Sequence, residues 1–365
     1  MKRTAVCILC LVLAVACLSG CGKKETVKFS EHPELYEKNM EYRDGFSILQ
    51  LTDIHWNGAT QIGDGTYGST HYLKKVIDEA VKHSGKIDLI EITGDTFMLS
   101  SAIAVKEFVD FMGEIGIPYA ITWGNHDREC DYNPNWLSKQ FLKAPFSLYT
   151  EVDNDDVHER SNYVINLTSD GKTVWQICHI DSGASYRNGA ADLSLTYDYM
   201  RDDQFAWMTA MHDRAGSDVP VLCYYHIVQA EVEQAYNAIK AGTADYKHKF
   251  FVTEAFASSD YAQNIEQVFR KNNVRGAFFG HDHSNDFTFT NADGIVFGYG
   301  VKSGKELYGT SIAKGCPDGG FEVTEDFDLI GASLVTLTDT EGNFRLEHLY
   351  LNERDGGDFV MWVEY

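Results

Sequence analysis

The chain has 365 residues, 44% of them hydrophobic, and a formal net charge of -23 at pH 7. This size allows one large core, and the 6 prolines form no linker that divides the chain, so we expect one globular domain over residues 41–365. Such an acidic body excludes nucleic-acid binding through overall charge, and phosphate binding would need a local positive charge such as bound metal ions.

The N-terminal segment differs from the rest of the chain. A short basic start precedes an apolar run from Val6 to Leu18, which is too short to span a bilayer comfortably. Leu18-Ser19-Gly20-Cys21 then resembles a bacterial lipobox. It predicts a signal peptide over residues 1–20, lipidation of Cys21, a polar tether over residues 21–40, and an exported protein anchored to a membrane of the cell envelope. The alternatives are an ordinary signal peptide or a short anchor with a chance cysteine.

The first half of the body alternates strands with helices. Apolar runs predict buried strands at 46–51, 87–92 and 117–122, and apolar residues at helical spacing predict helices at 70–83 and 102–115. Strand, helix, strand, helix, strand is typical of a sheet with helices on its face.

The second half is richer in strands, and turn signals such as Ser169-Asp170-Gly171 separate several of them. An α/β (α+β) fold of two packed sheets flanked by helices would accommodate this pattern. Segments 228–257 and 301–329 are expected to form loops over the site. The predicted elements are strands at 162–167, 173–180, 219–225, 274–279, 287–290, 295–299, 333–337 and 344–351, and helices at 202–214 and 261–271.

Four cysteines follow Cys21 in the sequence. Cys178 and Cys223 lie in apolar runs and are predicted to be small core residues. No CxxC pair occurs, so a thiolate metal site is not expected, and neither is a disulfide between Cys130 and Cys316.

Polar residues follow the ends of five predicted strands, which is where open α/β sheets place their ligands. Asp53 and His55 are two residues apart and point the same way in an extended chain. Gly94 lets the backbone turn so that Asp95 can face a site. The other groups are Gly124-Asn125-His126-Asp127, His226 after Tyr225, and Gly280-His281-Asp282-His283.

Each group alone has a plainer explanation. A Gly-Asp pair usually marks a turn, Asn125 or Asp127 could cap a helix, and His226 by itself would more often be a core histidine. Together, however, the groups supply three carboxylates besides Asp282, five histidines and one carboxamide at strand ends. These ligand types suit divalent Mn, Fe or Zn. A carboxylate shared by two ions roughly 3.5–4 Å apart is the arrangement that activates a bridging water toward phosphate.

The five groups resemble the signature of the calcineurin-like metallophosphoesterase family, D-x-H, G-D, G-N-H-D/E, H and G-H-x-H, between Asp53 and His283. The resemblance implies a two-sheet β-sandwich flanked by helices, and phosphoric ester hydrolysis by a metal-bridging water or hydroxide. It also implies that His126 is a general acid or electrostatic stabiliser whose tautomer is fixed by Asp127. One ion would be held by Asp53, His55, Asp95 and His283, and the other by Asp95, Asn125, His226 and His281.

Two positions depart from related sequences. The family usually has His-x-Pro where this chain has His226-Ile227-Val228, but the proline shapes a loop and is not a ligand. Purple acid phosphatases carry a tyrosine ligand where this chain has Met98, and they lack a histidine where it has His55. A purple iron enzyme is therefore not expected.

Further blocks resemble a purple-acid-phosphatase-like branch that lacks the tyrosine ligand. Asn285 and Asp286 would support the ligands, and Trp56, Tyr186 and Arg187 could line the substrate side. Arg187 and Asn125 are the candidate phosphate contacts, although a solvated loop is the plainer explanation for Arg187. The blocks are Ile180-Asp181-Ser182-Gly183, Gln204-Phe205-Ala206-Trp207 and Gly280-His281-Asp282-His283-Ser284-Asn285-Asp286.

Three classes of function follow. The favoured one is phosphomonoester hydrolysis, with a phosphodiesterase acting on nucleotides or lipids as its variant. The second is a lipoprotein that captures a phosphorylated ligand without turnover, which the complete ligand set argues against. The third is a structural or interaction protein, because the 20 tyrosines and 21 phenylalanines would suit such contacts, although they more often fill β-rich cores.

Overall fold

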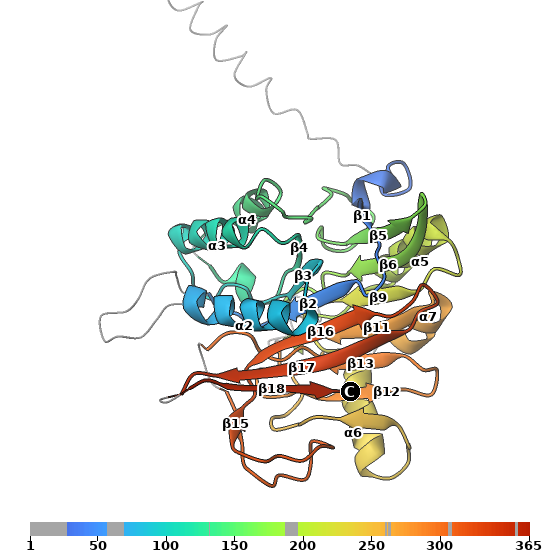
Figure 1. Ribbon diagram of the computed structural model, residues 1–365. Coiled ribbons are helices and arrows are strands. Elements are labelled where there is room, and N and C mark those ends of the chain that lie inside the picture. Colours follow the sequence, from blue (N-terminus) through green and yellow to red (C-terminus); the bar gives the residue numbers. More distant parts are fainter. Residues whose placement is uncertain are drawn as a thin grey trace, which may run out of the picture.

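Two large β-sheets face each other across a shared core, with helices on their outer faces (Figure 1). The computed structural model describes residues 28–56, 69–130, 132–186, 196–259, 261, 264–305, 309–354 and 357–365. The core between the sheets joins Leu49 of one sheet to Ile177 and Phe278 of the other, all of them fully buried. The predicted sandwich of two sheets flanked by helices is therefore confirmed.

One sheet has six strands and combines the beginning of the body with its end. Strands β2, β3 and β4 run parallel, and β16, β17 and β18 extend the sheet beyond β2 as an antiparallel meander. Parallel strands need crossover connections, which the helices α2 (Ser69–Ser84) and α3 (Ala102–Ile115) provide. The strand order is β18 (Phe359–Glu364), β17 (Phe344–Asn352), β16 (Gly331–Leu337), β2 (Ser47–Leu51), β3 (Leu89–Thr93) and β4 (Tyr119–Thr122).

The other sheet has eight strands, and β6, β9, β11 and β13 run parallel at its centre. β5 and β6 form the predicted hairpin, and its turn residues Asp170 and Gly171 have φ of 51° and 74°, as a tight two-residue turn requires. The order is β1 (Glu37–Glu41), β5 (Tyr163–Ser169), β6 (Lys172–His179), β9 (Val221–Tyr224), β11 (Val274–Phe279), β13 (Val296–Tyr299), β12 (Thr288–Thr290) and β10 (Lys247–Lys249).

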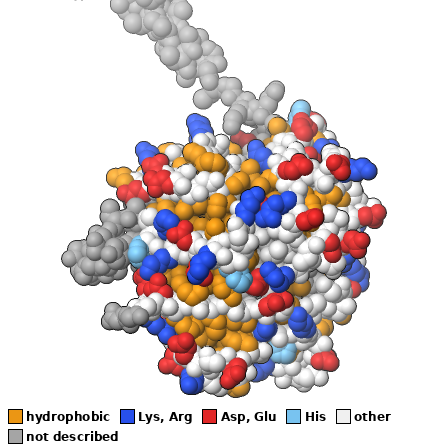
Figure 2. All heavy atoms as spheres, viewed as in Figure 1, with side chains coloured by type: hydrophobic (Ala, Val, Ile, Leu, Met, Phe, Trp, Pro, Cys, Tyr) orange, Lys and Arg blue, Asp and Glu red, His pale blue; other side chains and the backbone are white. Residues whose placement is uncertain are grey.

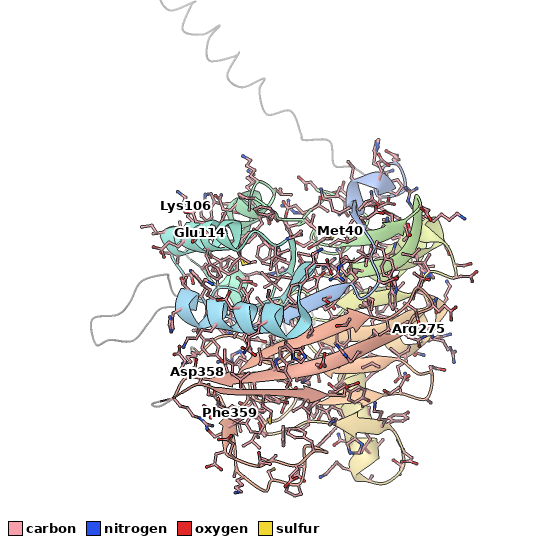
Figure 3. The ribbon with its side chains drawn as sticks, in the orientation of Figure 1. Met40, Lys106, Glu114, Arg275, Asp358 and Phe359 are labelled. Atoms are coloured by element: carbon pink, nitrogen blue, oxygen red, sulfur yellow. The ribbon has the colours of Figure 1, made fainter. Side chains whose placement is uncertain are left out.

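The helices follow local sequence signals. The hydroxyl oxygen of Ser101 accepts a hydrogen bond from the Ala104 amide at the start of α3, and Gly116 ends that helix with φ of 70°. Lys106 and Glu114 project from α3 on its outer side (Figure 3). The helices are α2 (Ser69–Ser84), α3 (Ala102–Ile115), α4 (Pro134–Phe141), α5 (Asp202–Ala215), α6 (Ala230–Lys240) and α7 (Ile265–Lys271).

The start of the body corrects one prediction. Residues 33–40 are not part of a polar tether, because Pro33–Tyr36 form a short 3-10 helix and β1, which follows directly, pairs in parallel with β5. Tyr36 is fully buried, and Met40 packs against the core (Figure 3). These two side chains attach an otherwise polar segment to the sheet. The signal peptide, Cys21 and the first part of the predicted tether lie outside the described residues.

Other boundaries also differ from the prediction. The helix expected over 261–271 begins at Ile265, because the Asn264 side chain caps it by accepting a hydrogen bond from the Gln267 amide. The segment 228–257 is not simply a loop, because it contains α6 and β10. The segment 301–329 contains two short paired strands, β14 (Ser311–Ile312) and β15 (Phe327–Asp328).

Acidic and basic side chains are interspersed on the face seen in Figure 2, so the negative charge is not gathered in one block there. Within the part of the chain that the structure describes, no helix is both long enough and apolar enough to cross a membrane.

A buried polar pair joins the two sheets. His179 on β6 lies with its Nε2 2.8 Å from Oε2 of Glu91 on β3, and both side chains are fully buried. The imidazole also stacks on Tyr163, with ring centroids 4.1 Å apart. Since a buried carboxylate is costly without a partner, this contact helps to fix how the sheets face each other.

Replacing His179 with leucine should therefore lower the free energy of unfolding by about 3–5 kcal/mol, because Glu91 would lose its partner in the core. The double variant Glu91→Leu/His179→Leu should lose less, since no carboxylate then remains buried. Urea unfolding followed by circular dichroism measures both. Equal losses in the single and double variants would contradict this account.

Candidate metal centre

The predicted ligands come together where the two sheets meet. Asp53 and His55 follow β2, Asp95 follows β3, and Asn125 follows β4 in one sheet, while the other three ligands follow β9 and β11 in the facing sheet. β2, β3 and β4 are parallel neighbours, and so are β9 and β11, so their carboxyl ends lie at the same edge of each sheet. The structure therefore brings the residues of the five motifs together.

Four of these side chains form the first ligand group. His55 Nε2 lies 3.0 Å from His283 Nε2, and that atom lies 3.5 Å from Asp53 Oδ1. Two ring nitrogens this close to each other and to a carboxylate would suit one shared cation. The ligand atoms of Asp53, His55, Asp95 and His283 all lie within 4.8 Å of one another.

The second group shares one member with the first. His226 Nε2 lies 3.2 Å from Asp95 Oδ2 and 3.2 Å from Asn125 Oδ1. The ring of His281 approaches that of His226 with a centroid distance of 5.1 Å. Asp95, His226 and His281 again have ligand atoms within 4.8 Å of one another, so Asp95 belongs to both groups.

The backbone around these ligands adopts an uncommon conformation. Four ligands have a positive φ, in the left-handed region that residues other than glycine rarely adopt. The φ values are 49° for Asp53, 47° for His55, 48° for Asp95 and 83° for His281. Such conformations cost free energy and persist where the surroundings impose them, often at functional sites. Here the loops after β2 and β3 impose them, because the amides of Asp53 and His55 donate to the carbonyls of Gly94 and Asp95.

Two glycines make this close packing possible. A Cβ at Gly94 would lie 2.4 Å from Nδ1 of His226, and a Cβ at Gly124 would lie 2.1 Å from Oδ1 of Asp95. No side chain fits at either position without displacing a ligand. The glycines of the G-D and G-N-H-D motifs are thus explained by space as well as by backbone freedom.

The polar atoms of the site fit a pair of metal ions. His281 is buried, yet neither of its ring nitrogens makes a hydrogen bond within the described part of the chain. Asp95 Oδ2 makes none there either, and has only its ion-pair contact with Nε2 of His226. Buried polar atoms normally have partners, so these atoms indicate a bound group. The Nδ1 of His226 lies 2.8 Å from the Thr93 carbonyl, an arrangement that turns its other nitrogen toward the site, as is usual for a metal-bound histidine.

The electrostatics of the site also suit metal binding. Burial lowers the pKa of His55 to about 4 and that of His281 to about 3, so both rings are neutral near pH 7, the form that binds metal. Burial would raise the pKa of Asp95, but the charge of His226 lowers it to about 2. Asp95 is therefore an ionised carboxylate within a buried site. Burial alone would lower the pKa of His226, but the carboxylates of Asp95 and Asp53 raise it to about 10, so a metal ion bound there would displace the proton of this ring.

The partner of His126 differs from the prediction. Asp127 is buried, and its carboxylate accepts hydrogen bonds from the amides of Phe97 and Gly124 and not from the His126 ring. Nδ1 of His126 lies instead 2.5 Å from Oε2 of Glu129. The short 3-10 helix η2 (His126–Arg128) produces this contact, because it places residues three apart on the same side. The predicted role of Asp127 in holding the His126 ring is thus wrong for this structure.

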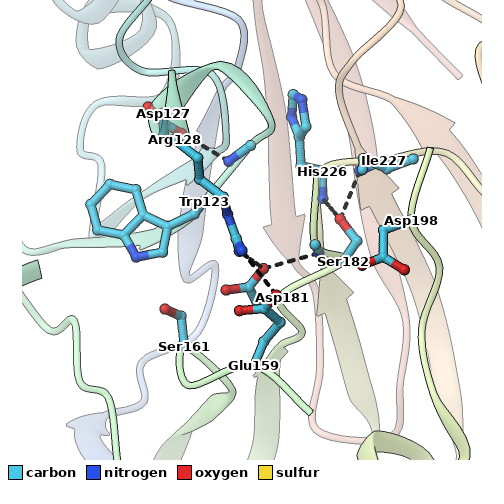
Figure 4. Close-up of polar contacts among 12 residues, drawn as sticks. Trp123, Asp127, Arg128, Glu159, Ser161, Asp181, Ser182, Asp198, His226 and Ile227 are labelled. Atoms are coloured by element: carbon cyan, nitrogen blue, oxygen red, sulfur yellow. Dashed lines mark hydrogen bonds and ion pairs between the residues drawn. The ribbon is translucent and has the colours of Figure 1, made fainter. Parts of the chain in front are cut away.

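A network of ion pairs and hydrogen bonds, which no single motif predicted, holds the loops that carry the ligands. Figure 4 shows the Arg128 side chain running from the turn after β4 to Asp181 and Glu159, with nitrogen–oxygen distances of 2.6 and 2.9 Å. The hydroxyl oxygen of Ser182 accepts hydrogen bonds from the amides of His226 and Ile227 (Figure 4). The Asp-Ser-Gly block thereby connects the loop that carries Asn125 with the loop that carries His226.

The loop after β11 is held in a similar way. Asn285 donates to the Asp282 carboxylate, 3.1 Å away, and its own oxygen accepts hydrogen bonds from the Thr253 and Glu254 amides. Asp286 lies 2.7 Å from Nδ1 of His348. The prediction that Asn285 and Asp286 support the ligands agrees with these contacts, since both residues anchor the segment that carries the ligand histidines.

The expected substrate-side residues fare differently. Trp56 is fully buried and packs against Phe108 and Phe111 of α3, so it belongs to the core and the prediction that it lines the substrate side is wrong. Its large apolar ring is better accommodated under a helix than in a polar site. Arg187 and the side chain of Tyr186 lie outside the described residues.

The four cysteines of the described part of the chain are free, with Cys178 and Cys223 buried as predicted.

Known proteins place the chain in a family. It belongs to the calcineurin-like phosphoesterase family, whose sequence profile matches residues 46–285, and it is accordingly a metallophosphoesterase. It is 27% identical over 309 residues to the probable inactive purple acid phosphatase 28 of Arabidopsis thaliana, covering 74% of each chain. It is 24% identical over 280 residues to phosphatase DCR2 of Saccharomyces cerevisiae, covering 66% of this chain and 44% of that protein.

A solved structure supports the fold. A dimetal phosphatase from Danio rerio superposes with a TM-score of 0.51 at 11% identity, over 88% of this chain and 100% of that one. The family and the purple-acid-phosphatase-like resemblance that the motifs predicted are both confirmed.

Because Asp95 belongs to both ligand groups, Asp95→Asn should reduce the bound metal from about two ions per chain to less than one. Inductively coupled plasma mass spectrometry of the purified protein measures this content. Asp110→Asn, at an exposed position of α3, is the matched control and should keep the full content. Unchanged metal content in Asp95→Asn would show that this carboxylate is not shared.

Proposed function

We propose that this protein hydrolyses phosphomonoesters. The observation that carries the proposal is the sharing of Asp95 between two ligand groups, next to the half-buried ring of His126. Two divalent ions bound there would supply positive charge for the phosphate and an activated water as nucleophile. The residues of the chain then have to orient the ester and provide a proton for its leaving group.

The charge of the ligand set favours a monoester over a diester. Asp53 and Asp95 carry two negative charges between them, and the other ligands are histidines and an asparagine. A site loaded with two divalent ions and a neutral bridging water would therefore keep a net charge of about +2. That charge matches the dianion of a phosphomonoester better than the single charge of a diester.

His126 is the proposed proton donor. Glu129 holds Nδ1 of the ring, which leaves Nε2 facing the site, 4.0 Å from Oδ2 of Asp95. The amide of His126 also donates to the other oxygen of Asp95, over 2.8 Å, so the residue is fixed relative to the shared ligand. A proton on Nε2 can then pass to the departing alkoxide oxygen, which is general-acid catalysis.

The choice of substrate can be tested directly. The metal-stripped protein is supplied with Mn, Zn, Fe or Mg and assayed with 4-nitrophenyl phosphate and bis(4-nitrophenyl) phosphate. We expect a higher kcat/KM for the monoester with at least one metal. A higher value for the diester would make the protein a phosphodiesterase, and no turnover with any metal would exclude an enzyme of either kind.

His126→Ala should lower kcat by about 10²–10⁴-fold while leaving metal content unchanged, because it removes the proton donor but no ligand. Glu129→Gln should lower kcat less, since the ring remains but is held more weakly. Steady-state kinetics and metal analysis of the same preparations separate the two effects. A loss of metal from His126→Ala equal to its loss of activity would make this residue a ligand.

A second candidate function is the capture of a phosphorylated ligand without turnover. It is favoured by the description of the Arabidopsis relative as probably inactive. The full set of ligands, together with His126, argues for the enzyme.

We also propose that Cys21 carries a lipid that anchors the protein to a membrane of the bacterial cell envelope. The support is the lipobox Leu18-Ser19-Gly20-Cys21 behind a short apolar run. Expressed in a bacterium, the protein should partition into the detergent phase of Triton X-114, and Cys21→Ser should not. Equal partitioning of both proteins would contradict lipidation.

A further inference from the structure

An exposed tyrosine lies directly against a metal ligand. Tyr197 is on β8 (Thr196–Tyr197), which pairs with β7 (Ser185–Tyr186), and its ring centroid is 4.3 Å from that of His281 at an angle of 82°. Tyr197 is 37% exposed and is among the few large hydrophobic residues of the described chain with so much accessible surface. Part of its ring is therefore available to a molecule bound at the metal centre.

More aromatic surface continues from Tyr197. Tyr199 stacks on Tyr261 with centroids 5.2 Å apart at 29°, and the Arg201 guanidinium lies 3.6 Å above the Tyr199 ring. Asp198 and Met200 are buried between these positions, so the side chains alternate between the interior and the surface. We call Tyr197, Tyr199 and Tyr261 the aromatic strip. It begins at a metal ligand and leads away from it.

The charged groups next to the strip compensate each other. The Arg201 guanidinium that lies over the Tyr199 ring is paired with the carboxylate of Asp198, 2.5 Å away. The strip therefore presents aromatic surface, and not an uncompensated charge, to a molecule bound at the metal centre.

We propose that the aromatic strip binds the alcohol part of the phosphate ester and that this part is a flat, uncharged ring system, as in a nucleoside. This proposal rests on the proposed phosphomonoesterase function and specifies its substrate class. Tyrosine rings bind flat rings by stacking or edge contacts, and such contacts tolerate different ring types. Tyr197 is the specificity-determining residue, because its ring contacts a metal ligand and Tyr199 lies two residues further along the chain.

A matched pair of substrates isolates the contribution of the ring. Adenosine 5′-monophosphate and ribose 5-phosphate have the same primary alcohol as leaving group and differ in the base. For the metal-loaded full chain we expect kcat/KM to be higher for the nucleotide. Tyr197→Ala should lower this preference about tenfold, and Tyr197→Phe should keep it. Tyr246→Ala removes a tyrosine next to β10, the edge strand of the eight-stranded sheet. This variant should leave kcat/KM for both substrates unchanged.

Two further measurements separate the possible failures. Metal analysis of Tyr197→Ala must equal that of the wild type, since a loss would indicate damage to His281. Calorimetric titration with adenosine, which lacks phosphate, tests the strip without catalysis, and binding should weaken about tenfold in Tyr197→Ala.

An unchanged nucleotide preference in Tyr197→Ala, or no adenosine binding by the wild type, would overturn the proposal and leave the phosphomonoesterase intact. Adenosine binding that depends on Tyr197, without turnover of any monoester, would support the strip and overturn the proposed hydrolysis.

Discussion

The carboxylate of Asp95 is fully buried at the place where two sheets meet, and one of its oxygens makes no hydrogen bond in the described chain, its contact there being the ion pair with His226. An ionised carboxylate in such a position is costly unless positive charge compensates it. His226 supplies part of that compensation from the facing sheet, 3.2 Å away. Two divalent ions would supply the rest of the compensating positive charge. The carboxylate of Asp95 therefore both joins the sheets and organises the site.

The fold serves this site by ending parallel strands at a common edge. Three strands of one sheet and two of the other direct their carboxyl ends toward it, and the loops that follow are hydrogen-bonded to one another. Glycines 94 and 124 leave room where a side chain would displace a ligand. Two residues hold these loops by hydrogen bonds without being ligands. Ser182 accepts from the amide of His226, and Asn285 donates to Asp282, between the two ligand histidines after β11. The site is thus rigid because neighbouring loops fix one another, and not because any one loop is regular.

Much of this arrangement can be predicted from the sequence because two signals coincide. Apolar runs locate the central strands, and the polar residues that follow the ends of these strands locate the candidate ligands. These signals do not predict β1. Its sequence, Glu37-Lys38-Asn39-Met40-Glu41, is mostly polar, and its place at the edge of the sheet depends on its pairing with β5. Trp56 directly follows the D-x-H motif, but whether its ring points inward depends on the packing of α3.

The sequence also does not predict the contact of Glu129 with His126 or the contact of Tyr197 with His281. The first depends on a single 3-10 turn, and the second on the pairing of two very short strands. Each involves residues whose types are common on surfaces, so no spacing rule distinguishes them from solvated side chains. Sequence motifs therefore predict the ligands of this site, whereas the groups that tune it emerge from tertiary structure.

Anomalous X-ray diffraction from crystals of the manganese-loaded protein would test the central claim most directly. The account predicts two anomalous peaks roughly 3.5–4 Å apart, with one oxygen or both oxygens of Asp95 within bonding distance of the two ions. A single peak, or two peaks of which only one adjoins Asp95, would contradict it.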